Sequence, residues 1–298
     1  MGKTILSTQH LCKFYPGVRA NDDISIEVEE GEVHAFVGEN GAGKSTLIKM
    51  IAGAYTPDSG TITIDGKPYK GLKPEQAREL GIEVIYQEFN LIPAMTCAEN
   101  IYLNKRTNRG LTVNGKERSK MARELFESMG VEIDPDRLVG SYTPGYMQIV
   151  EISKAIGQHV RILIMDEPTA PLTVAEVELF FNIIRKLKRE GVTIIYISHR
   201  LEEIFEIADR VSVFRDGKYI DTKKVSETSR QELINKMVGR VLTESYPKRR
   251  VEIGEETLRA EALCGNGVRN ISFTAHRGEI LGFAGLVGAG RTELMNVI

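Results

Sequence analysis

Residues 33–51 read VHAFVGENGAGKSTLIKMI. An apolar segment typical of a buried strand leads into a glycine-rich loop, and a helix-like apolar pattern follows it. The loop fits the pattern Gly-x4-Gly-Lys-Ser, in which backbone N–H groups and a lysine surround phosphates. The alternative is a plain glycine-rich turn, because the bare pattern arises by chance in about one chain per hundred of this size. The flanking strand and helix favour phosphate binding. The residues predicted to bind nucleotide here are Gly38, Asn40, Gly41, Ala42, Gly43, Lys44, Ser45 and Thr46.

A second feature is an internal repeat. Residues 22–51 align without gaps to residues 269–298, at a constant offset of 247 positions. The identities include all three loop glycines and the Gly-Glu pairs at 31–32 and 278–279, which a shared strand–loop–helix pattern alone would not produce. We interpret the repeat as a tandem duplication, with a first domain at 1–241 and the start of a second at 257–298. Periodicity lapses between them, which predicts a linker at 242–256.

The second copy of the loop differs in its cation. Arginine stands at the position that corresponds to Lys44, and its wide planar fork is a poor steric replacement for a compact ammonium group. We therefore predict a degenerate second phosphate loop. Its residues are Gly285, Gly290, Arg291 and Thr292.

Polar side chains follow other apolar segments. Asp166 and Glu167 end the segment RILIMDE, where the first is suited to hold Mg²⁺ beside Ser45 and the second to deprotonate a water. Alone, such acids are more often helix caps or loop residues, but the upstream phosphate loop favours the functional interpretation. Gln87 and His199 also follow apolar segments. Each alone is typical of a surface residue, yet the carboxyl ends of parallel strands are where ligands bind.

Element order and composition limit the fold and the partners. The apolar segments 161–166 and 193–199 enclose a helical pattern over 174–190, which predicts an α/β fold with a parallel sheet. The net charge of −2 argues against a nucleic-acid partner. Three scattered cysteines without metal-ligand spacing indicate reduced thiols in the cytosol. No apolar run approaches the roughly 18 residues of a membrane span, so we expect the protein to act from the aqueous side.

Together these segments resemble the nucleotide-binding domain of ABC transporters. The resemblance rests on GENGAGKST (38–46), IYQEFNLIPAMTCAENI (85–101), ILIMDEPTA (162–170) and IYISHRLEEIFEIADRVSVFRDG (195–217). With FYPGVRA (14–20), the last two are most similar to the fused double ATPase subunits of bacterial monosaccharide importers of the ribose, galactose or xylose type. The fold implied is an α/β P-loop NTPase core with a mostly parallel sheet, an antiparallel β-subdomain and a helical subdomain.

The resemblance also implies roles for single residues. Tyr15 would stack on adenine, and Gln87 would contact Mg²⁺ and the attacking water. Glu167 would be the general base, His199 would contact the γ-phosphate, and residues 170–173 would face the other domain. The implied cofactors are ATP and Mg²⁺, with the metal held by Ser45, Gln87 and Asp166.

One motif departs from the family pattern. Residues 142–156 read YTPGYMQIVEISKAI, where sugar importers tend to read LSVGQQQMVEIAKAL. Thr143 and Gly145 retain the hydroxyl and the glycine of this signature, but Pro144 removes a backbone donor and Tyr146 replaces a glutamine. In the family the domains face head to tail, so this signature and the Arg291 loop fall in one composite ATP site. We interpret that site as degenerate and the other as hydrolysing; the alternative is neutral drift, with Thr143 and Gly145 sufficient.

The resemblance implies an ATPase that powers sugar import from the cytoplasmic face of the membrane as a peripheral subunit. Its partners would be membrane permease subunits, contacted through residues 88–100, a second ABC domain of the same protein and, indirectly, a periplasmic or extracellular sugar-binding protein. Two alternatives stay open at this point. One is a soluble double ATPase acting on ribosomes, and the other is a nucleotide-sensing module without turnover.

Overall fold

The structure is a computed structural model that describes residues 2–103, 115–157, 160–239, 252–285 and 288–298. It contains two compact units, Met1–Val241 and Leu242–Ile298, and each is described by itself. None of the helices among the described residues is long and apolar enough to cross a membrane.

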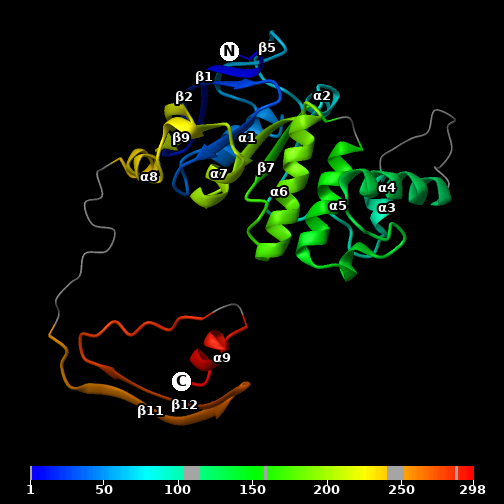
Figure 1. Cartoon of the computed structure of the whole chain (residues 1–298). Coiled ribbons are helices and arrows are strands. Elements are labelled where there is room, and N and C mark those ends of the chain that lie inside the picture. Colours follow the sequence, from blue (N-terminus) through cyan, green and yellow to red (C-terminus); the bar gives the residue numbers. More distant parts are fainter. Residues whose placement is uncertain (1, 104–114, 158–159, 240–251, 286–287) are drawn as a thin grey trace. The chain divides into compact units, whose positions relative to one another are not determined.

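A six-stranded sheet is the centre of the first unit (Figure 1). Its order is β10-β9-β3-β8-β7-β6, and every neighbouring pair is parallel except β9 and β10. Those two form a hairpin around Asp216 and Gly217, whose φ angles of 51° and 74° suit its tight turn. The strands are β3 (Val33–Val37), β6 (Ile82–Ile85), β7 (Ile162–Asp166), β8 (Thr193–Ile197), β9 (Arg210–Arg215) and β10 (Lys218–Lys224).

Both faces of this sheet are covered, because side chains alternate between two apolar cores. In β7, for example, Leu163 and Met165 join one core and Ile162 and Ile164 the other. The core on the first face also takes apolar residues from six helices: α3 (Cys97–Ile101), α4 (Gly115–Met129), α5 (Pro144–Ile156), α6 (Val174–Arg189), α7 (Leu201–Ile207) and α8 (Arg230–Val238). Helix α6 forms where the helical pattern over 174–190 predicts it and buries an apolar stripe, with Phe180, Phe181, Ile184 and Leu187 nearly inaccessible.

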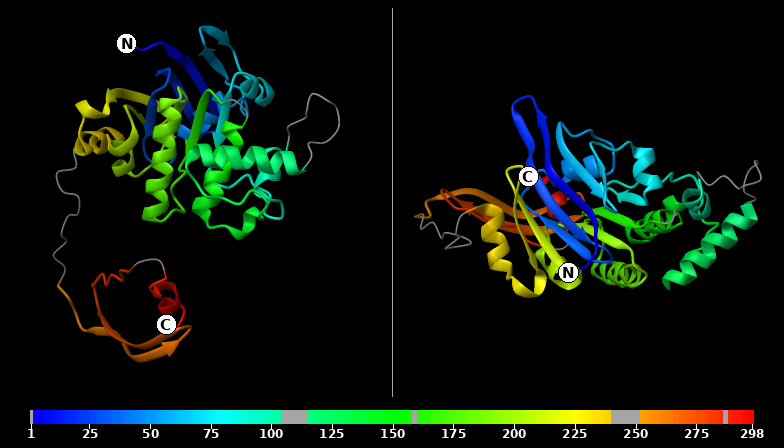
Figure 2. Two further views of the ribbon diagram at one scale, coloured as in Figure 1. Left: turned by 45° about the vertical axis from the view of Figure 1, so that its right-hand side comes forward. Right: turned by 90° about the horizontal axis from the view of Figure 1, so that it is seen from above.

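The opposite face packs against α1 (Lys44–Ile51), α2 (Pro74–Glu79) and a second sheet of order β2-β1-β4-β5. All pairs in that sheet are antiparallel: β1 (Thr4–Tyr15), β2 (Val18–Glu29), β4 (Ser59–Ile64) and β5 (Lys67–Tyr69). Helices α3, α4 and α5 pack on one another and lie away from the antiparallel sheet (Figure 2). The predicted α/β class, with an antiparallel β-subdomain and a helical subdomain, is confirmed.

The second unit contains a hairpin of β11 (Glu256–Gly265) and β12 (Val268–His276), followed by α9 (Arg291–Met295). The repeat aligns residues 280–284 with β3, but these residues form no strand, and Ile280 is 98% exposed. The reason is a lack of neighbours: β3 is paired on both sides, with β8 and β9, whereas residues 280–284 pair with no strand in the part of the chain that the structure describes. Most of the predicted linker, residues 242–251, lies outside the described residues.

Candidate nucleotide-binding site

The parallel register brings the carboxyl ends of four neighbouring strands to one edge of the sheet. Phe36 of β3 and Asp166 of β7 both pair with Ile197 of β8, while Ile85 of β6 pairs with Met165. The phosphate loop, the Asp166–Glu167 pair, the Gln87 segment and His199 each follow one of these ends. The structure thus gathers on one edge side chains that the sequence separates by more than a hundred positions.

The phosphate loop needs glycine at Gly43 for two reasons. Its φ of +94° lies in the left-handed region, and a Cβ there would stand 2.2 Å from the carbonyl oxygen of Ala20. The loop is held from the same side by Asn21, a fully buried residue whose Nδ2 donates to the Gly43 carbonyl at 3.2 Å. The sequence gives no signal for this role of Asn21, since an asparagine in a strand carries no distinctive pattern.

Lys44 lies folded into this loop. Its side chain is buried, and Nζ donates to the carbonyl oxygens of Gly38 at 2.8 Å and Glu39 at 3.1 Å. Burial lowers the pKa of Lys44, while the charges of Asp166 and Glu167 oppose that shift. A cation enclosed among carbonyl oxygens and N–H groups is suited to neutralise phosphate oxygens.

The predicted metal ligands Ser45 and Asp166 are in contact. Burial raises the pKa of Asp166, and a hydrogen bond with the Ser45 hydroxyl opposes the rise. Hydroxyl and carboxylate oxygens are ligands that Mg²⁺ prefers. Among the described residues no group of three or more acidic, histidine or cysteine side chains could hold a metal by itself. Gln87, the third predicted ligand, is exposed in the loop after β6.

Glu167 and His199 form a pair. The His199 Nδ1 lies 3.2 Å from Glu167 Oε1, and the two side chains are 59% and 22% exposed respectively. Glu167 has a φ of +50°, unusual for a non-glycine residue, and its N–H donates to the Ile197 carbonyl at 3.0 Å. A carboxylate and an imidazole held together at the open edge of the sheet fit a water-activating base beside a phosphate contact.

Tyr15, the predicted adenine platform, ends β1 and is 40% exposed. Its ring meets Tyr55 edge to face at a centroid distance of 6.4 Å, and Lys13 Nζ lies 5.8 Å from the ring centroid. An open aromatic face is what stacking on a base requires.

The predicted signature has an internal partner. Thr143 precedes the first residue of α5, and its hydroxyl donates to Glu176 Oε1 at 2.6 Å. The Gly145 N–H also hydrogen bonds to Glu176, and a Cβ on Gly145 would stand 2.3 Å from the Glu176 carboxyl carbon. These bonds, that of Thr143 first, lower the pKa of Glu176. An anion thus holds both donors that are predicted to bind a partner's phosphate.

Two further details concern this signature. Pro144 is the first residue of α5, where a proline is well tolerated because that N–H has no partner within the helix. Glu176 was not singled out from the sequence, although Thr173-x-x-Glu176 is a readable capping box, which the structure forms at the start of α6.

The second phosphate loop is described except for residues 286 and 287. Gly290 has a φ of +81° and precedes α9, as Gly43 precedes α1. Arg291 and Thr292 begin α9, while Gly285 lies before the gap, with the side chain of Ala289 against it. The local backbone of the loop therefore recurs although its cation differs.

Residues 21–170, half of the chain, match the family described as ABC transporter. The chain belongs to this family. Its relatives include the ribose import ATP-binding protein RbsA of Geobacillus kaustophilus (strain HTA426), 49% identical over 278 residues, covering 92% of this chain and 56% of that protein. Ribose import ATP-binding protein RbsA 1 of Rubrobacter xylanophilus (strain DSM 9941 / JCM 11954 / NBRC 16129 / PRD-1) is 48% identical, covering 99% and 59%. The chain thus spans a little over half the length of these ABC transporter relatives.

Solved structures agree with the family. A nucleotide-free ATP-binding cassette from an ABC transporter matches with a TM-score of 0.69 at 26% identity, covering 80% of this chain and 98% of that one. An ATP-binding cassette of an ABC transporter in its ADP conformation matches with a TM-score of 0.70 at 26% identity, covering 80% and 99%. The family predicted from the sequence is confirmed.

Proposed function

We propose that this chain binds Mg-ATP and is the hydrolysing part of a subunit that powers sugar import through a membrane permease. The Glu167–His199 contact at 3.2 Å, on the sheet edge that also bears the phosphate loop, is the observation on which this proposal rests most. The names of the ribose import relatives support the sugar class.

Each of these residues has a proposed role that follows from the chemistry of its side chain. Lys44 neutralises phosphate oxygens, and Tyr15 offers a face to the base. Ser45, Asp166 and Gln87 would hold Mg²⁺, which would supply positive charge to the phosphates when bound. Glu167 accepts the proton of the attacking water, and His199 contacts the γ-phosphate.

The proposal includes two unequal ATP sites in the complete protein. The signature at 143–145 would serve the site that contains the Arg291 loop. Three features support a degenerate role for that site: Pro144 has no N–H, Glu176 holds the remaining donors, and Arg291 replaces lysine. The site built on Lys44 would be the hydrolysing one.

The proposed setting is the cytoplasmic face of the membrane. Permease subunits would contact residues 88–100, and an external sugar-binding protein would deliver the solute. The first ABC domain would cover 1–241 and a second would begin near 257.

Two substitutions test the assignment of the hydrolysing site. We expect Glu167→Gln to abolish ATP turnover while Mg-ATP binding, followed by calorimetry, is retained. Arg291→Ala should leave turnover within about twofold of the parent, because a small change outside the chemistry removes no transition-state contact. Glu178→Gln, a substitution of an exposed acid on α6, is the matched control. Equal losses from Glu167→Gln and Arg291→Ala would refute the asymmetry.

Reconstitution tests the transport role. Turnover that rises with a sugar permease in vesicles, together with ribose uptake, is the expected result. Stimulation by ribosomes instead would favour the soluble double ATPase, and binding without turnover under all conditions would favour the sensing module.

A further inference from the structure

A buried carboxylate lies behind the proposed catalytic edge. Glu203 of α7 is only 5% exposed, and hydroxyl groups from three other residues converge on it. Thr169 Oγ1 lies 2.8 Å from both carboxylate oxygens, while Tyr196 Oη and Ser198 Oγ lie 2.8 Å and 2.9 Å from Oε2. A buried carboxylate is costly unless donors surround it, and here each of these partners is a donor.

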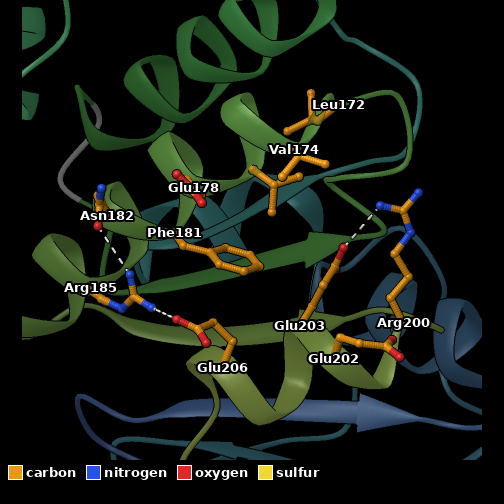
Figure 3. Close-up of a pocket in the computed structure, with 11 residues that line it drawn as sticks. Leu172, Val174, Glu178, Phe181, Asn182, Arg185, Arg200, Glu202, Glu203 and Glu206 are labelled. Carbon is orange, nitrogen blue, oxygen red and sulfur yellow. Dashed lines mark hydrogen bonds and ion pairs between the residues drawn. The ribbon is translucent and has the colours of Figure 1, made fainter.

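Arg200 completes the arrangement from outside. Its guanidinium donates to Glu203 Oε1 at 3.4 Å, and Figure 3 shows this contact beside a cavity of about 640 Å³. Leu172 and Phe181 line the same cavity. The hydroxyl partners on the other side of Glu203 are almost inaccessible, so little water can replace a lost hydrogen bond there.

Two of the three hydroxyls come from the loops that bear the catalytic pair, and the third, that of Tyr196, comes from β8. Thr169 follows Glu167 by two residues, and Ser198 directly precedes His199. Thr169 and Ser198 are themselves only 1% and 3% exposed. One carboxylate therefore joins the loop after β7 to the loop after β8, through residues close in sequence to Glu167 and His199.

We propose that Glu203 is a positioning residue for ATP hydrolysis, which holds these two loops in the register that brings Glu167 and His199 together. The inference rests on the proposed function. Glu167 has a left-handed backbone, a conformation that persists only where the surroundings hold it. No hydrogen bond among the described residues joins Glu203 to Glu167 or to the phosphate loop.

The test substitution is Glu203→Gln, which preserves the size of the side chain but replaces one carboxylate oxygen with an NH₂ group. That group is a donor and would face the hydroxyl donors around it. Its matched control is Glu202→Gln, the next residue, whose side chain is 67% exposed and pairs with Arg230 at 2.8 Å. We expect Glu203→Gln to lower kcat roughly tenfold or more, because small displacements of catalytic groups cost that much. The Kd for Mg-ATP should stay within about twofold, since the phosphate loop is untouched.

A double-mutant cycle separates positioning from general destabilisation. If Glu203 acts through His199, then Glu203→Gln in a His199→Ala background should lower kcat by no more than about twofold. The proposal would be overturned if Glu203→Gln lowered kcat by the same factor in both backgrounds, or if its kcat stayed within about twofold of that of the Glu202→Gln control. Should Glu203→Gln not fold, Thr169→Val removes one donor, retains the carboxylate and enters the same cycle with the same criteria.

A spectroscopic measurement tests the positioning role of Glu203 independently of ATP hydrolysis. The ring resonances of His199 should shift in Glu203→Gln and stay in place in Glu202→Gln, whether or not ATP is hydrolysed. Unmoved resonances would overturn the positioning role. Absence of ATP turnover in the complete protein, with the second domain present, would instead contradict the proposed function.

Discussion

Replacing Gly43 by alanine perturbs the phosphate loop at its most crowded point. The same substitution at Gly41 is a matched control, because Gly41 has a similar φ of +83° but nothing within 4 Å of the Cβ that alanine would add. At Gly43 the added Cβ would stand 2.2 Å from the Ala20 carbonyl oxygen and 2.7 Å from Asn21 Nδ2. The difference between the two variants therefore isolates the steric contribution.

The magnitudes follow from these distances. A left-handed backbone costs an alanine about 1–2 kcal/mol, which both variants share. Ordinary carbon–oxygen contacts begin near 3.3 Å, so Gly43→Ala must move the loop by about 1 Å relative to Ala20. Overpacking of this kind adds about 1–3 kcal/mol. We expect the free energy of unfolding to fall by about 3 kcal/mol for Gly43→Ala and by about 1 kcal/mol for Gly41→Ala.

Urea unfolding of the nucleotide-free protein, followed by far-UV circular dichroism, measures both values. Calorimetry with Mg-ATP then reports the loop itself, and a displacement of about 1 Å should weaken binding to Gly43→Ala by roughly 10- to 100-fold. Gly43→Ala unfolding no more easily than Gly41→Ala would refute the steric argument. Unchanged Mg-ATP affinity would refute the placement of the nucleotide in this loop.

Three further predictions concern single side chains. Glu176→Ala removes the anion that holds Thr143 and Gly145. When it is added to the Glu167→Gln chain, we expect ATP-driven self-association, measured by sedimentation analysis, to tighten. Weaker association would contradict the idea that Glu176 competes with a partner's phosphate for these donors. His34 is fully buried between Glu32 (Nδ1 to Oε1, 2.9 Å) and Ser212 (Nε2 to Oγ, 2.8 Å); His34→Phe should cost about 2 kcal/mol of unfolding free energy, and a loss near zero would show that these bonds contribute nothing net. Burial raises the pKa of the Cys97 thiol to about 11, which leaves little reactive thiolate at about pH 8. Iodoacetamide should therefore label the exposed Cys264 much faster than Cys97. Equal labelling rates, measured by mass spectrometry, would contradict the burial of Cys97.

Much of the first unit follows from local pattern. Apolar segments identify the strands β3, β7 and β8, and the residues after them, Lys44, Asp166 and His199, lie at the sheet edge as expected. This succeeds because parallel strands bring their carboxyl ends to one edge whatever their separation in the chain. The hairpin at Asp216–Gly217 is equally local, since its turn depends on adjacent residues alone.

Other parts depend on residues that pattern does not connect. Residues 280–284 repeat the apolar pattern of β3 yet form no strand, because a parallel strand requires partners to hydrogen bond with. Thr143 matches a signature hydroxyl in sequence, but its partner Glu176 lies 33 positions away. The same holds for Thr169 and Glu203, which are 34 positions apart.

The sequence by itself determined the family, the phosphate loop and the strand ends that bear the proposed chemistry, because each is specified by spacing within a short segment. Only the tertiary structure decided which groups meet: the Glu167–His199 pair, the Glu176 carboxylate on the signature, and Glu203 with a hydroxyl from each of the two catalytic loops. The physical reason is that an acidic residue has the same local pattern whether it is solvated or buried. Its role depends on the donors that folding brings around it.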